Sequence, residues 1–249
     1  MTQGFKNVNL VFPDGVKKGD LSFLGDQIVS LSVPDLPLLE GQQYYVCPGF
    51  LDEHIHGAKG YDVMDGEISS FQTMADALVQ EGVTAFLATT MTESEEKILR
   101  SCQCVSEYKK APHTGAEILG LHLEGPFISK AHKGAQDPSF IKKPDVSLLE
   151  RFRLASGDNI RLITFAYEND EDSSFLSYCL AHGITPSIGH SDATSEVFKK
   201  GISKGLRCVT HLFNAQRGFH HREPGITGEG LLQDGVKTEI ICDTYHVCP

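Results

Sequence analysis

The sequence predicts an α/β protein: a (β/α)8 TIM-type barrel, without its last strand and helix, that follows a small N-terminal β-sandwich-like domain. Three observations predict this fold. Short alternating apolar segments fill residues 1–46, apolar runs then alternate with segments of helical spacing, and seven such runs follow one another along the chain. Repeated strand and helix segments form right-handed βαβ units around a parallel sheet that is covered on both faces.

The N-terminal domain is predicted from three β-branched, alternating segments, VNLVF, GDLSFLG and QIVSLSV. The turns between them contain Pro13-Asp14-Gly15 and Gly25-Asp26, which are typical hairpin residues. We therefore place a small β domain at residues 1–46 and the barrel at residues 47–249.

The barrel is predicted from its alternating elements. The expected strands are residues 45–55, 83–90, 117–124, 160–167, 184–189, 207–212 and 238–242. The expected helices are residues 67–81, 93–109, 145–156, 172–182 and 194–204. An eight-stranded barrel alone takes about 250 residues, and here the last residues directly follow a seventh strand. We therefore expect a C-terminally shortened form of a longer protein.

Composition narrows the class of protein. The 33 acidic and 22 basic residues leave a net charge of −11, which argues against a general nucleic-acid or anionic-membrane binder. No apolar run approaches the roughly 18 residues of a membrane span, and the start MTQGFKNVNL lacks the order of a signal peptide. These features predict a cytoplasmic protein that binds neither nucleic acid nor membranes.

The cysteines predict no metal or redox site. Their number, seven, is odd, and none forms a C-x-x-C pair. Cys208 and Cys242 stand inside apolar runs, so we expect buried, reduced thiols.

Histidines and carboxylates gather at the ends of the predicted strands, where parallel barrels carry their functional groups. The first strand ends with His54 and His56, which point the same way because they are two residues apart. The ends of the third, fifth, sixth and seventh strands carry His122 and Glu124, His190, His211, and Asp243 with His246. One strand-end histidine commonly bonds to a backbone carbonyl, but their coincidence on one rim favours a metal site.

Histidine and carboxylate ligands together suit Zn²⁺, Fe²⁺ or Mn²⁺. Glu124, His190 and His211 form a plausible three-ligand site with an open position for water, and His54 with His56 could complete a second site. Such an ion lowers the pKa of water toward about 7 and polarises a carbonyl, as the hydrolysis of an amide requires.

Several motifs together resemble the N-acetylglucosamine-6-phosphate deacetylase family of the amidohydrolase superfamily. They occur in the family's order and are Pro48-Gly49-Phe50-Leu51-Asp52-Glu53-His54-Ile55-His56-Gly57, Leu121-His122-Leu123-Glu124-Gly125-Pro126-Phe127, Lys133-Gly134-Ala135-Gln136, Gly189-His190-Ser191-Asp192-Ala193-Thr194, His211-Leu212-Phe213-Asn214-Ala215 and Arg222-Glu223-Pro224-Gly225. The resemblance implies the hydrolysis of N-acetyl-D-glucosamine 6-phosphate to D-glucosamine 6-phosphate and acetate, a step of amino-sugar catabolism.

The resemblance also implies roles for individual residues. Glu124, His190 and His211 would bind the catalytic Zn²⁺ or Fe²⁺, and His54 with His56 a second ion, giving one or two ions per subunit. The implied substrate contacts are Ala135, Gln136, Asn214, Ala215, Arg222 and His246. Because the family's arginine reaches the phosphate bound by a neighbouring subunit, a homodimer is implied.

A local basic cluster, Arg217, His220, His221 and Arg222, fits this expectation. A guanidinium grips a phosphate with two parallel hydrogen bonds. Without the resemblance, a solvated loop would explain the cluster equally well.

Three positions depart from the family. Gln136 stands where some members have His, and an amide can still bond a sugar hydroxyl. Thr244 replaces a Gly, and a β-branched residue does not easily adopt a positive φ. The family's catalytic aspartate would lie beyond Pro249, so we expect no general base within the chain, and His246 as an oxyanion contact.

Two alternatives remain open. An amidohydrolase of cyclic amides is one, although such enzymes usually carry a lysine at a strand end and none is predicted here. The other is a non-catalytic remnant that binds metal or sugar phosphate, with little turnover and a tendency to associate through unpaired strand edges. The residues do not distinguish N-acetylglucosamine 6-phosphate from N-acetylgalactosamine 6-phosphate.

Overall fold

The computed structural model describes residues 3–32 and 44–249, so residues 33–43 of the predicted β domain, including Val33 of the third predicted segment, lie outside the described residues. The chain divides into two compact units, Met1–Phe50 and Leu51–Pro249. Among the helices described in these ranges, none combines the length and the apolar character that crossing a membrane requires.

The first unit is a four-stranded sheet with the order β3-β2-β1-β4. Its strands are β1 (Gln3–Phe12), β2 (Gly15–Leu24), β3 (Gln27–Ser32) and β4 (Tyr45–Val46). The first three form antiparallel hairpins across the two predicted turns, and β4 pairs in parallel with β1. Val8 and Leu10 on β1 are buried, but so is Asn9 between them, so burial in this segment does not follow the predicted alternation.

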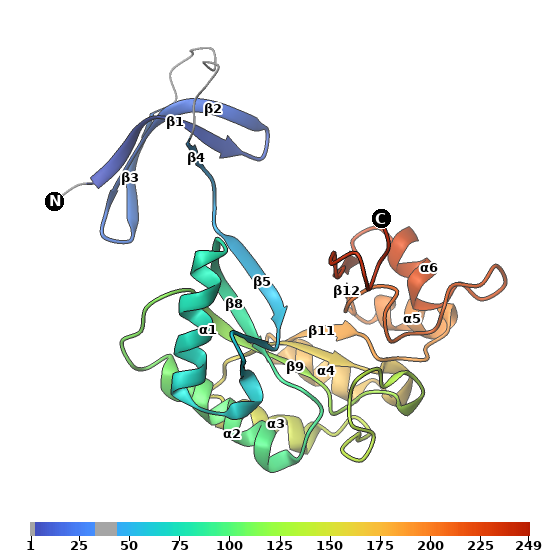
Figure 1. The fold of residues 1–249 in the computed structure, drawn as a ribbon. Helices are drawn as coiled ribbons and strands as arrows, with labels where there is room; N and C mark the ends of the chain where they lie inside the picture. Colours follow the sequence, from blue (N-terminus) through green and yellow to red (C-terminus); the bar gives the residue numbers. More distant parts are fainter. Residues whose placement is uncertain (1–2, 33–43) are drawn as a thin grey trace. The chain divides into compact units, whose positions relative to one another are not determined.

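The second unit is built on a seven-stranded sheet with the order β13-β12-β11-β10-β9-β8-β5 (Figure 1). Its strands are β5 (Phe50–Ile55), β8 (Val83–Thr89), β9 (Glu117–Glu124), β10 (Ile160–Phe165), β11 (Thr185–Ile188), β12 (Cys208–Val209) and β13 (Lys237–Thr238). Neighbours in the sheet are successive strands in the chain, and the ladders between β8 and β13 are parallel. This sequential, curled parallel sheet confirms the predicted barrel type, and β5 and β13 form its two edges.

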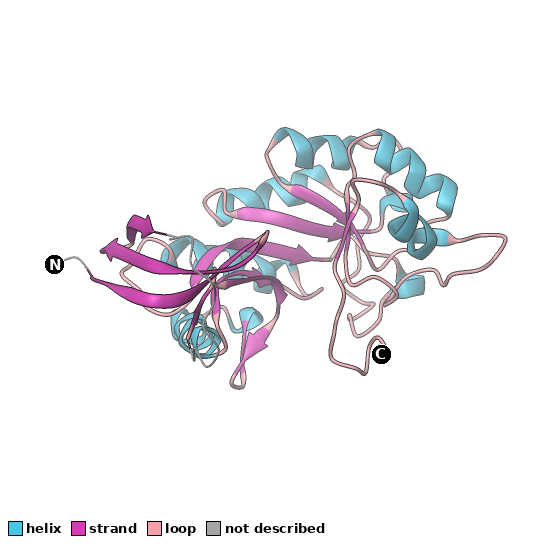
Figure 2. Cartoon of the chain, turned by 90° about the horizontal axis from the view of Figure 1, so that it is seen from above, coloured by secondary structure: helices cyan, strands magenta, loops and turns pink. Residues whose placement is uncertain are grey.

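Helices follow the strands and gather along one face of the sheet (Figure 2). Five were predicted and are present: α1 (Ile68–Gln80), α2 (Glu95–Tyr108), α3 (Val146–Ala155), α4 (Ser174–Ala181) and α5 (Ser195–Ser203). A sixth, α6 (Gly225–Leu232), was not predicted because its sequence, GITGEGLL, is rich in glycine. Short elements fill the loops: the β6 (Gly57–Ala58) and β7 (Tyr61–Asp62) hairpin, η1 (Val63–Asp65), η2 (Lys130–His132) and η3 (Tyr167–Asn169).

Two predicted strands have different limits in the structure. The run 45–55 is divided between the two sheets, because Pro48 and Gly49 interrupt it after β4. The run 238–242 was placed too late: β13 ends at Thr238, and Ile240, whose apolar character suggested a strand interior, is 47% exposed. The residue at this strand end is therefore Glu239.

The core of the second unit packs the helices against the sheet through large apolar side chains such as Phe71, Phe86, Phe165 and Phe198. All seven cysteines are free, and Cys102, Cys104 and Cys179 are buried in this unit. Burial raises the pKa of the Cys102 thiol to about 12. The prediction of a buried thiol is wrong for Cys242, which is exposed because the run that contains it is not a strand.

Candidate metal centre

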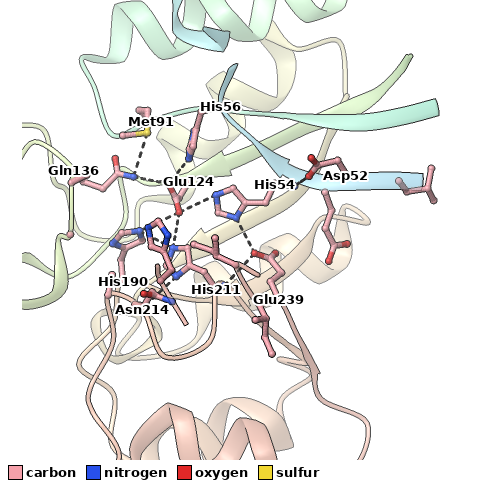
Figure 3. A pocket seen from close by; sticks show the side chains of 18 residues that line it. Asp52, His54, His56, Met91, Glu124, Gln136, His190, His211, Asn214 and Glu239 are labelled. Atoms are coloured by element: carbon pink, nitrogen blue, oxygen red, sulfur yellow. Dashed lines mark hydrogen bonds and ion pairs between the residues drawn. The ribbon is translucent and has the colours of Figure 1, made fainter. Parts of the chain in front are cut away.

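The predicted strand-end residues converge on one carboxylate, that of Glu124 at the end of β9 (Figure 3). His190 follows β11, His211 follows β12, and His54 lies on β5. Their Nε2 atoms lie 3.2, 3.0 and 3.3 Å from Glu124 Oε1. His56 Nε2 lies 3.3 Å from the other oxygen, Oε2. All five predicted ligands are thus neighbours in space.

The protonation pattern of these imidazoles follows from their outer nitrogens. Nδ1 of His190 lies 2.9 Å from the carbonyl of His132, and Nδ1 of His211 lies 3.1 Å from that of Asn214. A carbonyl only accepts hydrogen bonds, so each Nδ1 carries a proton, and each Nε2 is the ring nitrogen turned inward, where its lone pair can bind a cation once it is deprotonated. These two Nε2 atoms lie only 3.2 Å from each other. Two lone pairs and a carboxylate oxygen facing one another are the donor set that a cation requires.

The spacing of these atoms fits a transition-metal ion. Bonds of about 2.0–2.2 Å from Zn²⁺ to nitrogen and oxygen ligands imply ligand-to-ligand distances of about 3.3 Å in a tetrahedron, close to the separations above. Glu124 with His190 and His211, and Glu124 with His54 and His56, each form a group that could hold an ion. We call these groups the inner site and the edge site. Glu124 belongs to both.

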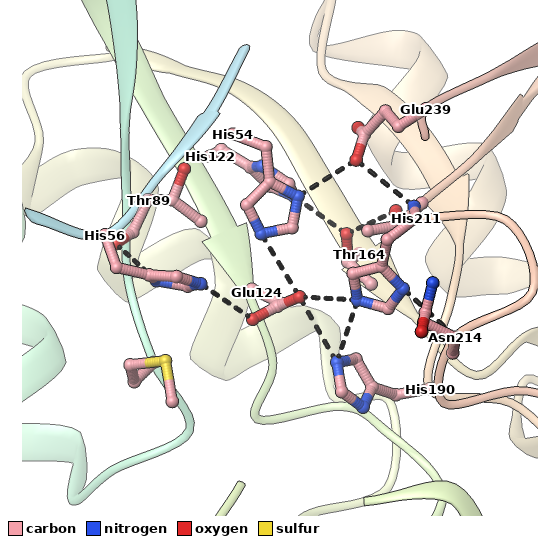
Figure 4. A network of polar contacts seen from close by, with 12 residues as sticks. His54, His56, Thr89, His122, Glu124, Thr164, His190, His211, Asn214 and Glu239 are labelled. Carbon is pink, nitrogen blue, oxygen red and sulfur yellow. Dashed lines mark hydrogen bonds and ion pairs between the residues drawn. The ribbon is translucent and has the colours of Figure 1, made fainter. Parts of the chain in front are cut away.

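A third possible group contains His54, His122 and Glu239. His122 fits it poorly because both of its ring nitrogens have partners: Nδ1 lies 3.1 Å from the carbonyl of Glu53 and Nε2 lies 2.7 Å from Thr164 Oγ1. Burial, reinforced by the nearby His54, holds the pKa of His122 well below its usual value. His122 is thus a neutral, hydrogen-bonded side chain of the interior (Figure 4).

Glu239 is the site residue that the sequence reasoning missed. Its Oε2 atom lies 2.9 Å from His54 Nδ1 and accepts a longer bond, 3.3 Å, from the backbone N–H of His211. Because Glu239 directly follows β13, its position at a strand end marks it as a candidate. The predicted strand 238–242 placed it inside a strand instead.

Charge is concentrated at the centre of the site. Burial alone would raise the pKa of Glu124, but the imidazoles of His190, His211, His54 and His56 together hold it well below its usual value. Burial alone would lower the pKa of His54, but its contacts with Glu124 and Glu239 raise it to about 10. Without a metal, Glu124 is therefore ionised and His54 is protonated.

Unusual backbone geometry places the two inner histidines. His190 has φ of +47° and His211 has φ of +31°, in a region that non-glycine residues rarely adopt. The loop after β9 supports His190, because Ser129 N–H donates to its carbonyl and Gly134 lies beside its ring. A Cβ at Gly134 would lie 3.2 Å from His190 Cε1, so a side chain here would require the ring to shift by a few tenths of an ångström.

The segment after His190 is tied down by Asp192. Its carboxylate lies 2.9 Å from His132 Nε2 and 2.9 Å from an Arg217 nitrogen, and Glu168 accepts a bond from its backbone N–H. His132 is also the residue whose carbonyl orients the His190 ring. Arg217 therefore supports the metal centre, and its predicted role in a phosphate-binding cluster stays a prediction.

Gln136 contacts the metal centre directly. Its Nε2 donates to Glu124 Oε2 at 2.6 Å, and its Oε1 accepts from Thr92 N–H at 2.7 Å. The side chain is buried and both ends of its amide are engaged. Sequence reasoning had assigned Gln136 to a sugar hydroxyl and did not foresee this contact.

A cavity of about 780 Å³ opens over the five predicted ligands. Of the predicted substrate contacts, those that line it are Ala135, Gln136, Asn214, Ala215 and His246. Arg222 is exposed and does not line this cavity, nor do His220 and His221. A concave site of this volume suits a small molecule.

The turn that carries His246 has the backbone that its sequence argued against. Thr244 adopts φ of +68°, so the expectation that a β-branched residue would not take this conformation is wrong. Asp243 explains the exception, because its Oδ1 accepts the backbone N–H groups of Tyr245 and His246 and closes the turn. Its Oδ2 lies 2.6 Å from His246 Nδ1, which fixes that ring at the rim.

Comparison with known proteins finds no matching family model. The chain is 40% identical over 207 residues to N-acetylglucosamine-6-phosphate deacetylase of Bacillus subtilis, which covers 82% of this chain and 52% of the relative. The chain thus spans about half the length of this curated relative.

Solved structures of the same kind of enzyme share the fold. The deacetylase of Thermotoga maritima superposes with a TM-score of 0.87 at 37% identity, over 98% of this chain and 64% of that one. A variant of the Mycobacterium smegmatis enzyme, in complex with N-acetyl-D-glucosamine 6-phosphate, gives 0.85 at 28% identity, over 100% and 65%.

Proposed function

We propose that this chain is a member of the N-acetylglucosamine-6-phosphate deacetylase family. It would contribute the metal centre and part of the substrate cavity to the hydrolysis of N-acetyl-D-glucosamine 6-phosphate to D-glucosamine 6-phosphate and acetate. The observation that carries the proposal is the convergence of the Glu124 carboxylate with the Nε2 lone pairs of His190 and His211 beneath a cavity of about 780 Å³.

The inner site would hold the catalytic ion, and the edge site a second one. The mixed nitrogen and oxygen donors favour Zn²⁺ or Fe²⁺. A divalent ion here supplies a water molecule of lowered pKa and polarises the acetamide carbonyl.

The chain's own residues would orient the substrate. Ala135, Asn214 and Ala215 line the cavity around the inner site and would lie against the sugar ring. His246, held by Asp243 at the rim, would donate from Nε2 to the developing oxyanion when its imidazole carries both protons. The proton transfer itself is assigned to none of the residues in this chain.

Arg222 would bind the phosphate group of the substrate that a neighbouring subunit holds. It is exposed with His220 and His221, outside the cavity of its own chain, as a residue that reaches into another subunit must be. We therefore propose a homodimer. We further propose a cytoplasmic location, because seven free cysteines, three of them buried, suit a reducing compartment.

Acetate release tests the function. Metal-loaded protein of full natural length should release acetate from N-acetyl-D-glucosamine 6-phosphate, and the same protein with Glu124→Ala should not. Equal release by the two proteins would overturn the proposal. N-acetylgalactosamine 6-phosphate, assayed in parallel, identifies the preferred sugar.

A further inference from the structure

We propose that Glu239 is a positioning residue for His54, and that binding of an ion at the edge site depends on it. The inference rests on the metal centre of the proposed function and adds a residue to it. Glu239 follows β13, and His54 lies on β5, so their contact joins the two edges of the seven-stranded sheet.

His54 is held differently from the other imidazoles around Glu124. Nδ1 of His56, His190 and His211 each lies beside a backbone carbonyl, at 3.2, 2.9 and 3.1 Å. Nδ1 of His54 instead lies 2.9 Å from the Glu239 carboxylate. Its ring orientation therefore depends on a side chain that substitution can remove.

The backbone of Glu239 is fixed well enough to orient another residue. Its N–H donates to the carbonyl of Val209 at 2.9 Å, and its own carbonyl accepts from Leu212 N–H at 2.8 Å. These bonds attach Glu239 to the segment that carries His211, and its Oε2 also accepts the His211 N–H. The carboxylate thus contacts one residue of each site, the His54 ring and the backbone of His211 (Figure 4).

The chemical consequence concerns the tautomer of His54. A carboxylate beside Nδ1 keeps the proton on that nitrogen, so the proton that an ion displaces is the one on Nε2, whose lone pair is then directed at the edge site. It also strengthens the imidazole as a ligand. Losing such a partner typically weakens metal binding about 10- to 100-fold.

Titration with Co²⁺, followed by its visible absorption, counts the ions and measures the affinity of each. We expect the 249-residue chain to bind two ions. In Glu239→Ala, binding of the second ion should weaken about 10- to 100-fold, while binding of the first ion is unchanged. In Glu239→Gln, an amide oxygen can still accept the Nδ1 proton, so much of the second-ion affinity should return.

Two further variants complete the test. Glu53→Gln removes a neighbouring carboxylate that has no hydrogen bond with the His54 ring, and it should leave both affinities unchanged. Glu239→Asp shortens the side chain by one methylene, so its second-ion affinity should resemble that of Glu239→Ala. If Glu239→Ala does not fold, the difference in second-ion affinity between Glu239→Asp and Glu239→Gln tests the role of Glu239.

The outcomes separate the two proposals. Unchanged second-ion binding in Glu239→Ala or Glu239→Asp, equal weakening of both ions, or only one ion in the unaltered chain would each overturn the role of Glu239. Failure of the unaltered chain to bind any ion would overturn the metal centre of the proposed function instead.

Discussion

The two halves of the metal centre share Glu124 but are built in different ways. The inner site takes its ligands from the ends of β9, β11 and β12, in the interior of the sheet, and the side chains of Glu124, His190 and His211 are 4, 5 and 8% exposed. The edge site takes His54 and His56 from an edge strand, and these side chains are 18 and 33% exposed.

The difference concerns what holds each ligand. Backbone carbonyls orient both inner histidines, so that site is supported by the main chain of its own loops. His54 depends on a carboxylate from the opposite edge of the sheet. We therefore expect the inner site to bind an ion more tightly and the edge site to respond more strongly to changes at the sheet edges.

The largest effect is expected where the two halves meet. Glu124→Ala removes the oxygen ligand of both sites, so each ion should bind more than about 100-fold more weakly. This exceeds the loss of about 10- to 100-fold that typically follows the removal of a residue that only supports a ligand. Co²⁺ titration measures this. The control is Glu117→Gln, a change to an exposed carboxylate on the same strand. Retention of one tightly bound ion in Glu124→Ala would show that the halves do not share this ligand.

Acid and alkali should act on different groups of the metal-free chain. Because the pKa of Glu124 lies well below 4.5, its contribution to stability is present above that value and is lost as the pH falls further. Because the pKa of His54 is raised from 6.5 to about 10, its contribution is complete below 6.5 and is lost as the pH rises to about 10.

Thermal melting measures this pH dependence. The melting temperature of the metal-free chain should fall between pH 6.5 and pH 10, and His54→Asn should flatten that part of the profile. The same alkaline slope in both proteins would mean that another group is responsible.

A glycine pair tests the support of the inner site. Gly134 and Gly183 both have positive φ, +56° and +67°, so alanine brings a similar backbone cost of about 1–2 kcal/mol at each. Only at Gly134 would the new Cβ meet His190, whereas nothing lies within 4 Å at Gly183. Inner-site affinity should fall about 10-fold in Gly134→Ala because ligand geometry must hold within about 0.5 Å, and it should be unchanged in Gly183→Ala. Equal affinities in the two variants would contradict this role of the loop after β9.

The smallest effect is expected at Asp192, whose contacts with His132 and Arg217 support His190 from a position 41% exposed. Exposed ion pairs contribute little, so Asp192→Asn should weaken inner-site binding by less than about 5-fold. The control is Asp158→Asn, which breaks another exposed ion pair, the one with Arg153. A loss as large as that in Gly134→Ala would show that the side-chain network, rather than the backbone, holds the inner site.

The ligands of both sites can be predicted from the sequence. Parallel strands end at one edge of a sheet, which places Glu124, His190 and His211 together, and alternate strand residues point the same way, which places His54 beside His56. The resemblance to the deacetylase family is confirmed by the relatives that match the chain.

The remaining features depend on contacts that no local pattern encodes. Glu239 was missed because Ile240 and Ile241 look like a strand interior, although they follow the strand. The resemblance assigned Gln136 to the substrate and charge placed Arg217 in a basic cluster, but neither indicated their contacts with Glu124 and Asp192. The positive φ of His190 is likewise supported by a tertiary bond from Ser129 N–H, whereas that of Thr244 is supported by local bonds to Asp243.

We propose above that Glu124, His190 and His211 hold a divalent ion, and anomalous diffraction from crystals of the metal-loaded chain would locate it. A peak is expected about 2.0–2.2 Å from Glu124 Oε1 and from the Nε2 atoms of both histidines. A peak bonded to other residues, or none at these three atoms in protein shown to contain metal, would contradict it.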